Sequence, residues 1–416
     1  MNANDYSPGA YVPGEARNIA RLKRVTQWTL AWIERLRHPN GVLPKLWPVW
    51  AAILVGMVVR NSAFYLNEIT SLFGHNDFRL YYAGAEVGLR YGWSRIYDVT
   101  LHQAAVAALQ PSGPWYAMLT PAPITWLVAP LTLLGYPTAY WVWVVLSLVA
   151  LGAAVWYARP RGHSTMIYFL WWAALSPLWF SAYEGQVTIL AAAAVLTGWR
   201  LLESRRDFLA GAILALALFK PYLILLLPLA LLVAGRFRAL LSFALVAAAA
   251  GLAMLLTLHP EGIRTYLETL MAPQAVGDMA ETLRFALGGG PYVLAIQVAA
   301  VIAVIAVAVH ARRTGTTWPF VVAALFGSFL LASYWHPQDY LLLDVAAAVT
   351  LAAGPLEAGV LAAAASAVLW APATPPLSNR VMIMGWLLIA TAFLGFLTVR
   401  ALRQSEPRRQ PATLTA

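Results

Sequence analysis

The sequence predicts an all-α protein that crosses the membrane many times. Hydrophobic residues make up 61% of its 416 residues and charged residues only 11%, with a mean hydropathy of +0.66. A soluble globular chain carries about 25% charged residues, so this chain cannot cover its surface with polar groups and needs lipid as its main solvent. Its apolar stretches also lack the alternation of period two that a membrane β-barrel requires, which leaves helices as the spanning elements.

Charge placement predicts which loops lie inside. The net charge is +10, and the basic residues cluster in short loops and tails beside apolar stretches. This pattern sets orientation by the positive-inside rule and does not favour a nucleic-acid-binding patch. The segments predicted to be cytoplasmic are the N-terminus, ESRRD (203–207), GRFR (235–238), HARR (310–313) and the C-terminus. The chain has no cysteine, which excludes disulfides, a thiol nucleophile and a cysteine-based metal site.

Three regions follow from this distribution. Residues 1–46 form a cytoplasmic N-terminal segment, in which 17–38 reads as a basic amphipathic helix lying on the cytoplasmic leaflet, or as a solvated tail. Residues 47–402 form the membrane domain, and 403–416 a cytoplasmic tail. No small-residue cleavage site follows the first apolar stretch, so it is expected to be an anchor and not a removed signal peptide.

Both ends of the membrane domain are predicted to be cytoplasmic, which requires an even number of spans. About 12 spans are therefore expected. Residues 67–116 form a long first outer loop with helical character, and the proline-rich stretch 117–135 is expected to re-enter or to lie flat. The apolar stretches are 47–66, 117–135, 138–158, 164–182, 187–202, 208–219, 221–235, 239–258, 291–310, 318–335, 340–355, 358–371 and 381–402.

The stretch 208–235 has two interpretations. It is either a hairpin with Lys220-Pro221 at its outer turn or one long kinked helix with Lys220 at its middle. The hairpin keeps the basic loops on both sides of it cytoplasmic and is preferred. Its arms are shorter than the roughly 20 residues that span a bilayer, so the turn would lie inside the bilayer thickness.

Polar residues from four segments are predicted to meet at the outer face. Ionisable residues at membrane depth are costly and usually mark a site or a pathway. The residues are Asp77 and Arg79 of the first outer loop, Glu184 and Gln186 of YEGQ, Lys220, and His336, Gln338, Asp339 and Tyr340 of YWHPQDY.

Each of these residues also has a structural interpretation when taken alone. Asp77 fits a helix cap, Lys220 a side chain that extends to the interface, and His336 a satisfied interfacial histidine. The arginines at 79, 90 and 95 fit the solvated face of a surface helix, and the aromatic residues between 81 and 97 fit an interfacial belt. The functional hypothesis therefore rests on their conjunction.

One chemistry uses such a set of residues, namely sugar transfer from a lipid phosphate. An acceptor hydroxyl must lose its proton as it attacks, so a carboxylate must lie within hydrogen-bonding reach of it. The polyprenyl phosphate that leaves needs a cation to stabilise its charge. Lys220 or one of the nearby arginines can supply that cation without a metal.

The order of the motifs resembles glycosyltransferase family 87. These motifs, between about 76 and 345, are DF-x-x-YY-x-A, GW-x-x-IYD, a proline-rich run, a GQ that opens an apolar helix, AG-x-x-L-x-L-x-x-x-KP, GRFRAL and H-x-x-DY-x-L. The resemblance implies a GT-C fold and an inverting transfer, metal-independent or weakly metal-linked, from a lipid-phosphate sugar. It also implies that Asp77 is the catalytic carboxylate and that Lys220 and His336 match the lysine and histidine of the family. The spacing of His336 and Asp339 departs from the family pattern, which puts the role of Asp339 in question.

The resulting hypothesis is a mannosyltransferase that uses polyprenyl-phosphate mannose. Arabinofuranosyl transfer, a lipid-linked sugar flippase or transporter, and a membrane protein without chemistry are the alternatives. The acceptor is a glycolipid or lipoglycan on the outer face of the plasma (inner) membrane, and a monomer without cofactor, metal or nucleic acid is expected. The residue roles are Asp77 as base, His336 as catalytic assistant, Lys220, Arg79 and Arg95 at the donor phosphate, and Glu184, Gln186, Asp339, Tyr340 and Tyr81 at the substrate.

Overall fold

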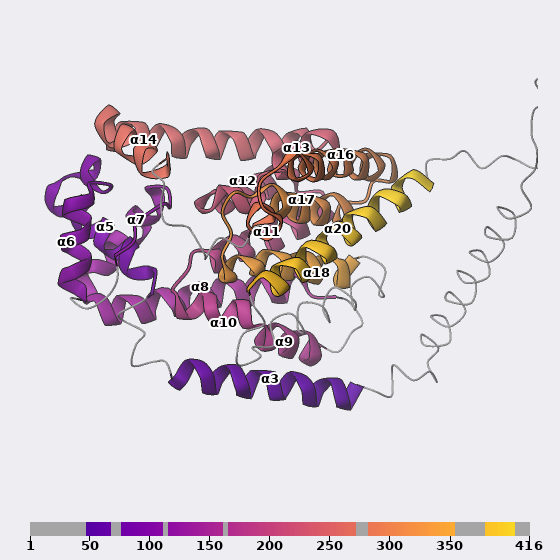
Figure 1. Cartoon of the computed structure of the whole chain (residues 1–416), viewed down its shortest axis with the longest axis horizontal. Coiled ribbons are helices and arrows are strands. Elements are labelled where there is room, and N and C mark those ends of the chain that lie inside the picture. The colour runs from indigo at the N-terminus through magenta and orange to yellow at the C-terminus, as the bar shows by residue number, and fades with distance from the viewer. Residues whose placement is uncertain are drawn as a thin grey trace, which may run out of the picture. The chain divides into compact units, whose positions relative to one another are not determined.

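A computed structural model of the chain describes residues 47–67, 76–110, 115–160, 165–271, 282–353 and 379–403. Every regular element in these ranges is a helix (Figure 1). The chain divides into two compact units, residues 1–56 and 57–416, and the contacts given below lie within the second. The predicted all-α class is therefore confirmed for the described part of the chain.

The helices follow the apolar stretches of the sequence closely. Their bounds are α3 Trp47–Asn67, α5 Phe78–Tyr91, η2 Trp93–Arg95, α6 Val99–Leu109, α7 Pro123–Val128, η3 Ala129–Leu134, α8 Tyr136–Ala158, α9 Thr165–Ala174, α10 Ser176–Tyr183, α11 Thr188–Glu203, α12 Asp207–Ala215, η4 Leu216–Phe219, η5 Pro221–Ile224, α13 Leu227–Val233, α14 Phe237–Met271, α15 Leu283–Leu287, α16 Pro291–Thr314, α17 Trp318–Leu331, η6 Pro337–Tyr340, α18 Leu341–Ala353 and α20 Asn379–Arg403.

Four of these helices, α3, α8, α14 and α16, are long and apolar enough to cross a membrane. They expose large apolar side chains, such as Leu252 and Leu256 of α14 and Ile302 of α16, as lipid-facing helices do. In contrast, α17 is buried along nearly its whole length. A helix that is apolar and buried all round lies inside the protein core. The structure thus supports a membrane protein, while the number of about 12 spans stays a prediction.

The basic loops gather at one end of the helices. Arg236 Nη1 lies 3.3 Å from Asp207 Oδ1, and a Cβ atom added to Gly235 would lie 3.2 Å from Nε of Arg312. These two contacts join the three loops 203–207, 235–238 and 310–313. We call this region the basic end of the molecule, and its composition agrees with the expectation that the three loops share one side of a membrane.

The stretch 208–235 is a hairpin. Asp207 begins α12 and Arg236 follows α13, and because these two residues pair, the chain leaves the basic end and returns to it. Lys220 lies at the turn, between η4 and η5, with φ −134° and ψ 79°. Pro221 disfavours helical backbone for the residue before it, which agrees with the end of the helix there. The alternative of one kinked helix is wrong.

Two other stretches differ from their predicted outlines. The stretch 164–182 is broken at Leu175, which has extended backbone before Pro177 in the first turn of α10. The residues that follow the apolar stretch 239–258 are helical as far as Met271, after a break at His259, where φ is 55°. In both places proline suits the first turn of a new helix better than the interior of an old one.

The first outer loop is helical where it is described, as predicted, and its helices are α5, η2 and α6. The end of α14 packs against it: the rings of Tyr97 and Tyr266 stack at 4.5 Å, and Arg95 lies 3.7 Å from Glu261. This contact fixes the loop beside the helices that carry the other polar residues. The stretch 117–135 forms only the short helices α7 and η3, in agreement with a segment too short to span a bilayer.

Several sequence-based expectations lie outside the described residues. They are the amphipathic helix 17–38, the apolar stretch 358–371 and nearly all of the tail 403–416.

Candidate functional site

The predicted polar residues meet at the ends of α11, η4 and α17 that lie opposite the basic end. α11 runs from this region to loop 203–207, η4 ends at Lys220, and α17 leads from the basic end toward His336. At about 1.5 Å per residue, the 16 residues of α11 separate the two regions by roughly 24 Å. The sequence therefore predicted correctly that these segments converge at one end.

The turn before α5 places Asp77. Asn76 Oδ1 accepts hydrogen bonds from the backbone N–H of Arg79 at 3.1 Å and from the hydroxyl of Tyr136 at 3.0 Å. Asn76 therefore caps the helix, and the side chain of Asp77 makes no capping bond. Asp77 thus occupies the position before α5 without capping it through its side chain, which leaves its carboxylate available for another role.

The YEGQ turn holds the backbone of Asp77. The carbonyl of Glu184 accepts from the N–H of Phe78 at 3.0 Å, and its carboxylate accepts from the N–H of Asp77 at 3.1 Å. Gly185 has a φ of +60°, and a Cβ there would lie 2.6 Å from Cβ of Phe78. Only glycine fits this left-handed position and this close approach. The indole N–H of Trp143 donates to the Gly185 carbonyl at 2.8 Å, which ties the turn to α8.

Gln186 holds the carboxylate itself. Its side-chain amide donates to Asp77 Oδ2, and its own amide oxygen accepts from the Tyr81 hydroxyl at 3.1 Å. Burial raises the pKa of Asp77 above its ordinary value, while the charges of Lys220 and Arg79 and the bond from Gln186 oppose the rise. A carboxylate with a raised pKa is a stronger base.

Asp339 is the centre of a second set of contacts. Its Oδ1 accepts from Lys220 Nζ at 2.7 Å and from the Thr188 hydroxyl at 3.1 Å. Its Oδ2 accepts from the Tyr222 hydroxyl at 3.0 Å and from the backbone N–H of His336 at 3.1 Å. The side chains of Lys220 and Asp339 are 5% and 0% exposed. Because Lys220 is buried, it does not extend to an interface. A buried ion pair needs hydrogen bonding as complete as this to offset the loss of water.

His336 is a neutral hydrogen-bond donor in this arrangement. Burial lowers its pKa to about 4, against the opposing charge of Asp339. Its side chain accepts from the backbone N–H of Asp339 in a capping box that starts η6. The neutral ring therefore carries its proton on the other nitrogen, which can donate to a substrate oxygen.

The arginines of the first outer loop separate into two groups. Arg79 is buried, 1% exposed, and its charge acts on both Asp77 and Glu184. Arg90 and Arg95 are exposed and form ion pairs with Glu86 and Asp98 at 3.6 and 3.5 Å. The interpretation as a solvated face thus holds for these two and is wrong for Arg79.

The aromatic residues of the loop are mostly core residues. Tyr81, Tyr82 and Tyr97 are at most 4% exposed, so the interpretation as an interfacial belt is wrong for them. Tyr340 is also fully buried, with its ring centroid 5.7 Å from that of Phe329. Its predicted contact with substrate stays a prediction.

The sequence did not indicate four residues of the site: Asn76, Thr188, Tyr222 and Tyr334. Each lies within two residues of one that was singled out, and this closeness is the only signal that could have found them. The ring of Tyr334 stands perpendicular to that of His336 at 4.4 Å. Within the described ranges, no three His, Asp or Glu side chains gather to hold a metal ion.

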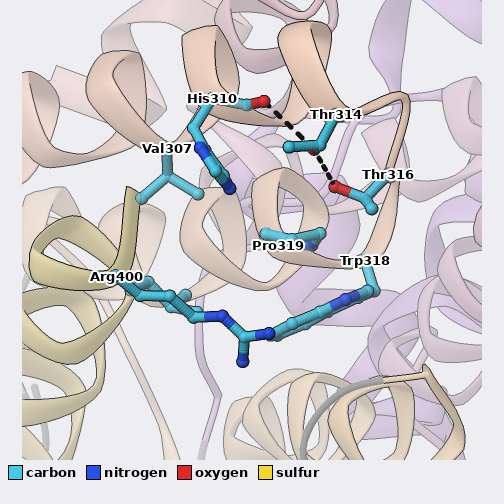
Figure 2. Close-up of a pocket in the computed structure, with 8 residues that line it drawn as sticks. Val307, His310, Thr314, Thr316, Trp318, Pro319 and Arg400 are labelled. Carbon is cyan, nitrogen blue, oxygen red and sulfur yellow. Dashed lines mark hydrogen bonds between the residues drawn. The ribbon is translucent and has the colours of Figure 1, made fainter. Parts of the chain in front are cut away.

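A hollow of about 70 Å³ lies between α16, α17 and α20, far from these residues. Figure 2 shows the imidazole of His310 directed into it, with Arg400 beside the ring of Trp318. Ligand pockets usually measure about 300–1,000 Å³, and no carboxylate lines this one. The polar cluster, and not this hollow, is the candidate active site.

Comparison with protein families supports a glycosyltransferase. No curated protein and no solved structure matches the chain. The model of glycosyltransferase family 87 matches residues 119–334, just over half of the 416 residues. The match includes the YEGQ turn and Lys220 and ends on either side short of Asp77 and His336. The chain belongs to glycosyltransferase family 87.

Proposed function

We propose that the protein transfers a sugar from a polyprenyl phosphate to a hydroxyl of a glycolipid or lipoglycan, with mannose as the proposed sugar. The observation that supports this most is the Asp77 carboxylate, which is fixed through Oδ2 by Gln186 and lies within reach of the charges of Lys220 and Arg79. Asp77 takes the proton of the acceptor hydroxyl as the acceptor oxygen attacks the anomeric carbon. The bond from that carbon to the phosphate oxygen breaks, and polyprenyl phosphate leaves with the electron pair.

The transfer is proposed to invert the anomeric carbon. A second carboxylate, Glu184, lies close to Asp77, but it already accepts from the Asp77 backbone. Burial and the Asp77 charge also raise its pKa well above the ordinary value. The raised pKa makes the ionised, nucleophilic form of Glu184 less available, so a covalent intermediate on Glu184 is disfavoured.

Lys220 and Arg79 are the proposed cations for the donor phosphate. An ammonium group has three N–H donors, and Asp339 takes one from Lys220. His336 adds a neutral donor for the phosphate or the acceptor. Arg95 lies in exposed ion pairs with Asp98 and Glu261 and is not part of this proposed phosphate site.

The donor class is tested by incubating the purified protein with labelled polyprenyl-phosphate mannose, arabinofuranose and glucose in turn. Label should move into an acceptor lipid from one of these donors and from no nucleotide sugar. Transfer from a nucleotide sugar alone would contradict the proposal.

The site is proposed to face the outside of the plasma membrane, because the basic end should face the cytoplasm. The chain has no cysteine, so single cysteines report their own accessibility. A membrane-impermeant maleimide on intact cells should label Gln103→Cys, an exposed position of α6, and not Ser204→Cys at the basic end. Ser204→Cys should react after permeabilisation, and the reverse pattern would overturn the orientation.

A further inference from the structure

Gln186, which was predicted from the sequence as a substrate contact together with Tyr81, forms hydrogen bonds with both Tyr81 and Asp77. The Tyr81 hydroxyl donates to the Gln186 amide oxygen at 3.1 Å, and the Gln186 amide N–H₂ donates to Asp77 Oδ2. Gln186 is 3% and Tyr81 2% exposed. These three side chains therefore form one chain of hydrogen bonds that ends on the carboxylate.

The direction of these bonds is fixed by chemistry. A carboxylate only accepts, so the amide must present its N–H₂ group to Asp77 and its oxygen to Tyr81. The Tyr81 hydroxyl satisfies that oxygen and so holds the amide in this orientation. Without the hydroxyl, the amide could rotate and turn its oxygen toward the carboxylate, which would be repulsive.

The two carboxylate oxygens of Asp77 therefore differ in their hydrogen bonding. Oδ2 accepts from Gln186, whereas no described residue donates to Oδ1. The backbone on either side is held independently, because Glu184 accepts from the N–H groups of both Asp77 and Phe78. The carboxylate is thus fixed in position and in rotation, with one oxygen left for a substrate proton.

We propose that Gln186, oriented by Tyr81, is a positioning residue that makes Asp77 Oδ1 the proton-accepting atom of the site. The inference rests on the proposed function in that it assigns roles within the same reaction. It differs from the sequence-based prediction because neither side chain is assigned a contact with the sugar. Both residues act through Asp77.

The pKa of Asp77 gives this role a distinctive readout. A hydrogen bond donated to an ionised carboxylate favours the charged form, so loss of the bond must raise the pKa. The acid limb of the rate profile should then move to higher pH, by about one to two units for a bond to a charged group. Besides Tyr81, the ionisable groups that face Asp77 are Arg79, Glu184, Lys220, Tyr334 and Asp339, and all five stay unchanged in the Gln186→Ala and Tyr81→Phe variants.

The test compares Gln186→Ala and Tyr81→Phe in transfer assays over a range of pH. Gln186→Ala should lower kcat by about tenfold or more, with KM for donor and acceptor unchanged and the acid limb at higher pH. Tyr81→Phe should shift the limb in the same direction by less. In the Gln186→Ala background the Tyr81→Phe change should have no further effect, because the hydroxyl acts through the amide.

Matched controls are Gln297→Ala and Tyr266→Phe, whose polar groups bond to backbone carbonyls elsewhere in the fold. Both should retain the wild-type profile. A raised KM with an unmoved acid limb in Gln186→Ala would overturn the inference and make Gln186 a substrate contact.

A second measurement separates this inference from the proposed function. The protonated-carboxyl infrared band that disappears in Asp77→Asn can be titrated without any substrate. Its midpoint should lie at higher pH in Gln186→Ala than in the wild type. An equal midpoint would end the inference even in an active enzyme, whereas a wild-type protein inactive with every polyprenyl-phosphate sugar would end the proposed function alone.

Discussion

Asp77→Asn should reduce sugar transfer by at least about 100-fold, since general base catalysis contributes typically 10²–10⁴-fold. Asparagine keeps the size of the side chain and the backbone bonds to Glu184, but its amide cannot accept the proton of a hydroxyl. Transfer kinetics should show the loss in kcat, while the binding of the polyprenyl-phosphate donor changes little.

Asp98→Asn is the matched control for this variant. It makes the same chemical change in the same loop, at the N-cap of α6, where asparagine caps as well as aspartate. This variant should transfer sugar at the wild-type rate. Equal activity in Asp77→Asn and Asp98→Asn would remove Asp77 from the mechanism.

Lys220→Met should destabilise the protein by about 3–5 kcal/mol, the cost of leaving one member of a buried ion pair alone. Asp339 would keep its bonds from Thr188 and Tyr222 but would lose the only cation among its described partners. Transfer should also fall, because the cation proposed for the phosphate is absent. Thermal unfolding in detergent and transfer assays measure the two effects separately.

The double variant Lys220→Met/Asp339→Leu separates the contribution of Lys220 to stability from its contribution to sugar transfer. Removing both charges leaves no unpaired ion, so much of the lost stability should return, whereas transfer should not. Arg264→Met in α14 is the comparison, since its pair with Glu268 is exposed and should contribute about 0–1 kcal/mol. Recovery of full activity in the double variant would show that Lys220 is only structural.

Residues of the site that stand out against an apolar chain could be predicted from the sequence. Asp77, Lys220 and His336 are costly in such surroundings, and their placement at one end followed from the basic loops at the other. The hairpin at Lys220 was predictable for the same reason, because a hairpin keeps the basic loops on both sides of it cytoplasmic. Composition and charge placement thus predicted the helical class and the convergence of the segments.

The partners within the site could not be predicted in the same way. Thr188 and Asp339 are 151 residues apart in the chain, and a threonine at the start of a helix is ordinary. Likewise, nothing in the sequence shows that Asn76 caps α5 in place of Asp77, because both residues favour that position. α5 packs against α6, α7 and α8, and the periodicity of α5 alone does not reveal that this packing buries Tyr81 and Arg79.

The most direct test of the account measures both products of a single reaction. Purified wild-type protein in liposomes, given labelled polyprenyl-phosphate mannose and an acceptor lipid, should release one polyprenyl phosphate for each mannosylated lipid formed, and Asp77→Asn should release neither. Labelled donor that crosses the bilayer intact, with no polyprenyl phosphate released, would contradict the account and indicate a transporter.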